Sequence, residues 1–238
     1  MNPQKIVIIT TSHNKMGELE RRTGLWLESL ATPYYIFREA GAIVTVASLT
    51  GGIIPLDPKS ESLIVATSHT KRFLKDLEAG DVLIHSNPLN SLRAEDFDGV
   101  LLAGGHGAIW DFPGNSDLKK LLEDFDRQHK LIAALDHGVA ALLSLQKTDG
   151  TPFVSGRSLT ASSNKEEELS GLTKSLPFLL ESGLVDLGGT YIKGSNYASH
   201  MVVDGLLITG QNPASSGEVA KRMLLALKMR AENPAYAF

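Results

Sequence analysis

Residues 131–143, LIAALDHGVAALL, carry the pattern that decides the fold. Five apolar residues, typical of a buried strand, end at Asp136, His137 and Gly138, and apolar residues at helical spacing follow. A carboxylate, an imidazole and a glycine between a strand and a helix are typical of a nucleophile elbow, which holds one residue in a strained turn at a helix N-terminus. Taken alone, the stretch is equally explained by a helix whose N-cap is Asp136.

The flanking segments predict an α/β fold with a mostly parallel sheet. Residues 5–10 and 42–49 have the composition of buried strands, and residues 24–40 between them have helical spacing, so the chain opens with a β-α-β unit. Pro33 is expected to begin a new turn or to kink that helix. Residues 99–103 predict a further strand.

The remaining segments give weaker patterns, and a single domain over 1–238 is expected because no stretch has the composition of a linker. Residues 51–94 have poor periodicity and are expected to form an excursion outside the sheet. Asn115 or Ser116 is expected to cap a helix. After residue 150 the patterns indicate a hairpin-like piece at 151–161, a helix start at 164–169, a helix near 176–183, extended pieces near 186–192 and 206–209, and a final helix from Pro213 to Arg230.

Composition narrows the functional classes. The chain has 238 residues, of which 21% are charged and 42% hydrophobic, with a formal net charge of -4, as in ordinary globular proteins. The sequence has no Lys/Arg-rich block that would suggest nucleic-acid binding, and no apolar run long enough to suggest a membrane span. The N-terminus has no secretion signal pattern, so a cytoplasmic location is expected. The chain has no cysteine, which excludes thiol nucleophiles, thiolate metal ligands and disulfides.

Three polar clusters follow predicted strands, at the positions where open parallel sheets form their sites. They are GGHG at 104–107, DHG at 136–138 and GQNPASS at 210–216. A glycine pair can expose N–H groups to an oxyanion or a phosphate, although turns that need positive φ explain such loops as well. The histidines are dispersed without metal-ligand spacing, so neither a metal nor a cofactor is expected.

Several motifs, in order from the first strand to the last helix, resemble the ThiJ/PfpI superfamily and above all its branch of heat-shock chaperones and glutathione-independent glyoxalases. They are RTGLWLESLATPYYIFREAG, PLDPKS, LLAGGHGAIWDFP, AALDHGVAAL and ITGQNPASS. The resemblance implies a flavodoxin-like, class I glutamine amidotransferase-like fold in which helices sandwich the sheet. It also implies a small-molecule substrate and a homodimer, without nucleic acid or membrane partners.

The resemblance also implies which residues form the site. The elbow cysteine of the family is replaced by Asp136, and His137 follows it. The acidic residue that approaches the elbow from the first helix matches Glu28, and the carboxylate that partners the histidine matches Glu167. Glu166 or Glu168 would take the latter place in a shifted register. The oxyanion-hole or substrate-binding positions match Gly104, Gly105, His106 and Gly138.

Aspartate at the elbow changes the chemistry that the resemblance implies. Family glyoxalase chemistry runs through an adduct between a thiolate and an α-oxoaldehyde, and a carboxylate cannot form a comparably stable adduct. If Glu28 and Asp136 lie within hydrogen-bonding distance, the two carboxylates are expected to share a proton, with Asp136 ionised and Glu28 protonated.

Three functions remain open from the sequence. The first is a hydrolase or lyase for a small amide, ester-like or α-hydroxy/oxo-carbonyl substrate, with Asp136 as base or nucleophile, Glu28 as acid and His137 as proton shuttle. The second is a catalytically silent chaperone for unfolded client proteins, or a stress-related ligand-binding protein. The third is a Cys-to-Asp variant of a glutathione-independent glyoxalase.

Overall fold

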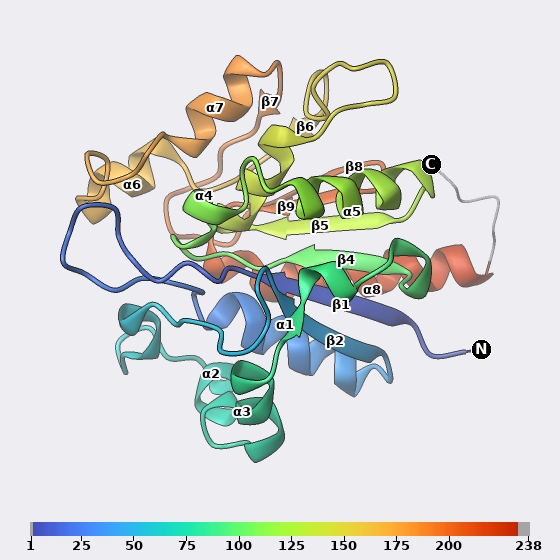
Figure 1. Ribbon diagram of the computed structural model, residues 1–238, viewed down its shortest axis with the longest axis horizontal. Coiled ribbons are helices and arrows are strands. Elements are labelled where there is room, and N and C mark those ends of the chain that lie inside the picture. Colours follow the sequence, from blue (N-terminus) through green and yellow to red (C-terminus); the bar gives the residue numbers. More distant parts are fainter. Residues whose placement is uncertain (1, 233–238) are drawn as a thin grey trace.

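A computed structural model, shown in Figure 1, describes residues 2–232 of the protein. Its main sheet has seven strands in the order β3-β2-β1-β4-β5-β9-β8, and β6 and β7 form a separate pair. The strands are β1 (Lys5–Thr10), β2 (Ile43–Ser48), β3 (Asn87–Pro88), β4 (Gly99–Leu102), β5 (Leu131–Leu135), β6 (Ser158–Leu159), β7 (Thr190–Tyr191), β8 (Met201–Asp204) and β9 (Leu207–Gly210). Only the β8–β9 pair of the main sheet is antiparallel.

Helices lie on both faces of this sheet (Figure 1), which confirms the predicted α/β sandwich. The α-helices are α1 (Glu28–Glu39), α2 (Ser68–Phe73), α3 (Leu77–Ile84), α4 (Ala108–Asp111), α5 (Ser116–Arg127), α6 (Asn164–Ser170), α7 (Leu180–Asp186) and α8 (Ser216–Glu232). The 3₁₀ helices are η1 (Pro58–Glu61), η2 (Leu89–Ser91), η3 (Ala94–Asp96), η4 (Asp136–Ser144) and η5 (Pro213–Ser215). No helix within residues 2–232 has the length and apolar character needed to cross a bilayer.

Alternate residues of the central strands supply the two cores. Ile6 and Ile8 of β1 point into the core beneath α1 and α8, whereas Val7 and Ile9 point into the core beneath α5 and η4. Because successive strand residues face opposite sides of a sheet, a strand covered on both faces must be apolar throughout. This requirement explains the continuous apolar runs that made the strands recognisable in the sequence.

Strand order brings the three polar clusters of the sequence together. β5 pairs in parallel with β4 on one side, with Leu102 opposite Ala134, and with β9 on the other, with Leu135 opposite Gly210. Parallel neighbours end at the same edge of a sheet, so the segments after β4, β5 and β9 share that edge. The elbow after β5 therefore lies between the other two clusters.

Several local expectations were wrong. Helix α1 continues through Pro33 while packing against α8, so the proline does not start a new helix. The elbow opens the 3₁₀ helix η4 rather than an α-helix, and its buried residues suit the narrower 3₁₀ coil. Residues 151–161 form no hairpin, because Phe153 and Val154 enter the core and β6 pairs in parallel with β7. Of the two expected caps of α5, Asn115 is confirmed, because its side chain accepts a bond from the Leu118 N–H.

The excursion expected at residues 51–94 contains η1, α2, α3, β3 and η2. It returns to the sheet at β3, which pairs with the end of β2 and forms the sheet edge. Figure 1 shows α2 and α3 beyond this edge, at the end of the molecule opposite α6 and α7. The segment matters for the site because η1 carries Lys59, whose side chain reaches the cavity described below.

Candidate active site

Asp136 occupies the strained tip of the elbow. It directly follows β5 and has a φ of 54°, which residues other than glycine seldom adopt. Neighbouring glycines make room for the turn. A Cβ on Gly104 would lie 2.6 Å from Asp136 Cβ, and a Cβ on Gly138 would lie 2.6 Å from the Leu102 carbonyl oxygen. Gly104 and Gly138 thus allow close packing, whereas the sequence assigned them to substrate binding.

The carboxylate of Asp136 is held from two sides. Its Oδ2 accepts the Gly105 N–H at 3.0 Å and lies 3.0 Å from His137 Nδ1, and the residue is 5% exposed. Gly105 was expected to offer its N–H to a substrate oxyanion, but this N–H is engaged by the elbow carboxylate itself. The other oxygen, Oδ1, makes no hydrogen bond with any residue in the range 2–232 and remains available to a ligand.

His137 is a charged bridge between two carboxylates. Its Nδ1 faces Asp136, and its Nε2 lies 2.6 Å from Glu167 Oε1. Only the protonated ring can donate from both nitrogens. Burial by itself lowers the pKa of His137, but the charges of Asp136 and Glu167 outweigh burial and raise the pKa to about 10. Because both nitrogens are engaged, the geometry does not favour the expected role as a proton shuttle.

Glu167 completes the chain of hydrogen bonds. Its Oε1 also accepts the Ser162 hydroxyl at 2.6 Å, and its Oε2 lies 3.2 Å from His106 Nε2. Burial alone would raise the pKa of Glu167, but the charge of His137 and the hydrogen bond from His106 hold this pKa well below its usual range. Glu168, one of the alternatives left open by the sequence, has an exposed side chain and is not the buried partner of His137.

His106 contributes its side chain, whereas the sequence favoured its backbone. The centroid of its ring lies 4.1 Å from the centroid of the His137 ring. Its Nδ1 is buried without a hydrogen-bond partner in the described part of the chain. His106, His137 and Glu167 offer ligand atoms within 4.8 Å of one another and could hold a metal ion. A metal would have to displace the proton between His137 and Glu167. The expectation of no metal rested on the spacing of the histidines in the sequence. Such spacing does not reveal a cluster of ligands that come from three separate segments.

Glu166 is a second buried carboxylate, and it has a structural role. Its oxygens accept bonds from the N–H and hydroxyl of Ser163, the N–H of Tyr197, and the amides of Gln211 and Asn212. These bonds tie α6 to the segments that precede and follow β9. The only sequence signal for this role was the spacing of Ser163 and Glu166, which is that of a capping box. Asn212 also caps η5, at the start of the last helical segment.

Glu28 accepts hydrogen bonds from two threonines, which were not the partners expected for it. Its two carboxylate oxygens accept the hydroxyls of Thr32 at 2.6 Å and Thr67 at 2.5 Å, and His69 Nδ1 lies 3.0 Å from the Thr32 hydroxyl. Glu28 is also absent from the described residues that line the cavity beside Asp136. The structure therefore does not support a proton shared between Glu28 and Asp136.

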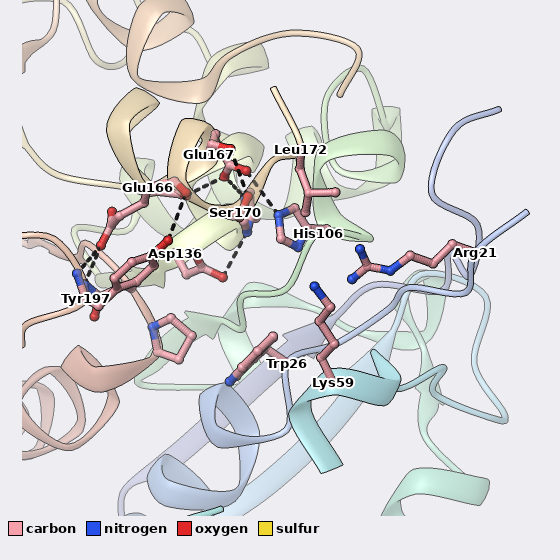
Figure 2. Close-up of a pocket in the computed structure, with 14 residues that line it drawn as sticks. Arg21, Trp26, Lys59, His106, Asp136, Glu166, Glu167, Ser170, Leu172 and Tyr197 are labelled. Atoms are coloured by element: carbon pink, nitrogen blue, oxygen red, sulfur yellow. Dashed lines mark hydrogen bonds and ion pairs between the residues drawn. The ribbon is translucent and has the colours of Figure 1, made fainter. Parts of the chain in front are cut away.

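A cavity of about 190 Å³ lies beside the elbow (Figure 2), with Asp136, His137 and Glu167 at its buried end. This volume is below the roughly 300–1,000 Å³ typical of pockets for drug-sized ligands. Arg21 and Lys59 line the more exposed end. Sequence reasoning missed both cations, because neither follows a predicted strand. Lys59 lies within the motif PLDPKS, but the motif gave it no role.

Comparison with known proteins adds the family to this geometry. Residues 27–226 match the DJ-1/PfpI family, which is most of the chain. The chain belongs to the DJ-1/PfpI family. Glutathione-independent glyoxalase HSP31 of Saccharomyces cerevisiae is 27% identical over 239 residues, covering 96% of this chain and 100% of the relative. Glyoxalase 3 of Candida albicans is 25% identical over 242 residues, covering 94% of this chain and 98% of the relative.

A solved structure extends the comparison to three dimensions. Rapid Encystment Protein 24 kDa of Francisella tularensis superposes with a TM-score of 0.90 at 34% identity, covering 94% of this chain and 99% of that one. The family predicted from the sequence motifs is thereby confirmed, as is the mostly parallel sheet flanked by helices. In this DJ-1/PfpI chain the elbow residue is Asp136, so its side chain offers a carboxylate.

Proposed function

We propose that this protein is an enzyme of the lyase type that transfers a proton at the carbon next to the carbonyl group of a small α-hydroxy or α-oxo compound. The observation that carries the proposal is the oriented carboxylate of Asp136, with Oδ2 fixed by Gly105 and His137 and Oδ1 open to a ligand. The names of the curated relatives support a small carbonyl substrate, because they are called glyoxalases.

Asp136 acts as the general base in the proposed step. Its Oδ1 takes the proton from the α-carbon, and the electron pair of the broken C–H bond moves onto the carbonyl oxygen to give an enediolate. Protonation of the former carbonyl carbon and transfer of the remaining hydroxyl proton to the neighbouring oxygen complete the rearrangement. An α-oxo aldehyde enters the same step as its hydrate, so water is its only co-reactant and no oxidant or cofactor is consumed. The carboxylate that serves as the base lies 3.0 Å from Nδ1 of His137, whose other nitrogen faces Glu167.

His137 and Glu167 have positioning roles in this proposal. The His137 cation lies beside the elbow and favours the negative charge that develops on the substrate. Glu167 keeps that cation in place from the other side. Hydrolysis by a carboxylate nucleophile is less well supported, because the Gly105 N–H that would stabilise an oxyanion already bonds Asp136.

Hydrogen–deuterium exchange at carbon tests the proposal. Dihydroxyacetone, glycolaldehyde and methylglyoxal incubated with the protein in D₂O should gain deuterium at the α-carbon or in the rearranged product, as followed by proton NMR. Asp136→Asn should slow this exchange by roughly 10²–10⁴-fold. An unchanged rate in Asp136→Asn would refute the role of the carboxylate.

Two other outcomes separate the remaining functions. If only Asp136→Cys converts methylglyoxal, the protein is a glutathione-independent glyoxalase whose thiol has been replaced. If neither protein is active but unfolded clients stay in solution, the chaperone alternative is favoured.

A homodimer also stays a prediction, and sedimentation should give about twice the chain mass of 25.6 kDa.

A further inference from the structure

We infer that the substrate is a small compound with a terminal anionic group, a carboxylate or a phosphate, that Arg21 and Lys59 bind. The inference rests on the proposed function, because it names the substrate class of the same cavity. Both side chains line that cavity. Figure 2 shows their nitrogen-bearing ends directed into the same part of it, on the side of His106.

A buried carboxylate fixes the segments that carry the two cations. Asp57 is fully buried; its Oδ2 accepts the Thr23 hydroxyl at 3.0 Å, and its Oδ1 accepts the backbone N–H of Lys59 at 2.9 Å. The Asp57 N–H donates to the Leu25 carbonyl at 2.9 Å. Thr23 and Leu25 lie just after Arg21 in the chain. These hydrogen bonds connect the loop that carries Arg21 to the turn that carries Lys59. The backbone positions of the two residues are therefore fixed relative to each other.

Neither cation is neutralised by the protein. Arg38, for comparison, pairs with Glu78 at 2.7 Å. Within residues 2–232, no carboxylate lies within 4.0 Å of the Arg21 guanidinium or the Lys59 ammonium. Two positive charges directed into one small cavity repel each other, and an anion bound between them converts this repulsion into two attractions. A guanidinium can form two parallel hydrogen bonds to a carboxylate or phosphate, and an ammonium adds a point charge.

The carboxylates that line the cavity are already engaged. Asp136 and Glu167 are both bonded to His137, and Glu166 accepts five hydrogen bonds from the surrounding backbone and side chains. The cavity is therefore divided between a buried end with the elbow carboxylate and a more exposed end with two unpaired cations. This division fits a ligand whose carbonyl lies at one end and whose charge lies at the other.

The size of the cavity limits the ligand to a few carbon atoms beyond the anionic group. Its volume of about 190 Å³ is small, and Trp26 and Leu172 contribute apolar lining. A short carboxylic acid that carries an α-hydroxycarbonyl group and a phosphorylated short hydroxycarbonyl compound both have the required chemistry. Either would use its anion to place the α-carbon beside Asp136.

Binding is tested without catalysis in Asp136→Asn. Calorimetry at low ionic strength should detect inorganic phosphate, pyruvate, or both, and glycerol as a neutral ligand of similar size should bind much more weakly. Phosphate alone would assign the phosphorylated class, and pyruvate alone the carboxylic acids. Failure of both anions to bind would overturn the inference.

Matched charge removals locate the site. Arg21→Gln or Lys59→Gln, made on the Asp136→Asn background, should weaken anion binding by about tenfold or more. Arg22→Gln removes the neighbouring exposed charge, and Lys71→Gln removes an exposed charge on α2; neither residue lines the cavity. Equal losses of anion affinity in these two controls would overturn the inference. They would show that the overall positive potential of the surface, rather than a defined site, attracts the anion.

The two proposals fail in different experiments. Anion binding without α-carbon exchange in the wild type would overturn the proposed function and leave the anion site standing. Exchange that is equally fast for dihydroxyacetone and its phosphate, with the same KM in Arg21→Gln, would overturn the anion site and leave the proposed function standing. If both hold, Arg21→Gln should raise KM for the phosphorylated compound at least several-fold with little change in kcat.

Discussion

The imidazole Nε2 of His137 lies 2.6 Å from Oε1 of Glu167, which is 30 residues further along the chain, and both side chains are buried. The other nitrogen of the same ring lies 3.0 Å from Asp136. The elbow carboxylate is therefore connected through His137 to a glutamate on α6. The linkage makes protonation of His137 the property that most affects both the stability and the chemistry of the site.

Stability should fall as the pH rises above neutrality. The pKa of His137 is raised to about 10 in the folded protein, against an ordinary value near 6.5. A raised folded-state pKa stabilises the fold fully below the ordinary value, and this stability is lost as the pH rises through the folded value. Urea unfolding should show the free energy of unfolding decreasing by up to about 1.4 kcal/mol per pH unit across this window. His137→Gln should lack this component, and an identical slope would contradict the charged bridge.

Glu167→Gln should destabilise the fold by about 3–5 kcal/mol, because it leaves the buried His137 cation with one carboxylate fewer. It should also lower the pKa of His137, which NMR titration of the imidazole can follow. Glu168→Gln is the matched control, since this neighbour is exposed on the same helix. Similar unfolding midpoints for the two variants would contradict the role of Glu167.

Gly104→Ala should displace the elbow. The added Cβ would lie 2.6 Å from Asp136 Cβ and 2.7 Å from the Leu135 carbonyl oxygen, and neither backbone-anchored group can move freely. Overpacking of this kind typically costs about 1–3 kcal/mol in the free energy of unfolding. Gly80→Ala is the control, because its Cβ would meet open space within α3. Thermal unfolding of both variants checks the difference.

Glu28→Gln should leave α-carbon exchange within about twofold of the wild-type rate, because Glu28 bonds Thr32 and Thr67 rather than the elbow. Replacing a charged acceptor of two hydroxyls should still lower the free energy of unfolding by about 1–2 kcal/mol. A loss of exchange as large as that of Asp136→Asn, in a folded variant, would restore the predicted acid–base pair. Circular dichroism verifies folding.

Local sequence patterns determined the architecture and the location of the site. Continuous apolar runs identified β1, β2, β4 and β5, because strands covered on both faces carry apolar side chains throughout. Polar clusters after β4 and β5 placed the site, because neighbouring parallel strands end at one edge. The elbow aspartate was evident in the sequence itself.

Only the tertiary structure decided which side chains meet. The carboxylate of Glu28 accepts bonds from Thr32 and Thr67. Asp57 connects the segments that carry Arg21 and Lys59, which are distant in the sequence. Strand and helix periods specify which face a residue occupies, but the direction of a carboxylate depends on donors supplied by other segments. The sequence by itself thus determined the fold and the aspartate at the elbow, and tertiary packing decided the partners of that aspartate.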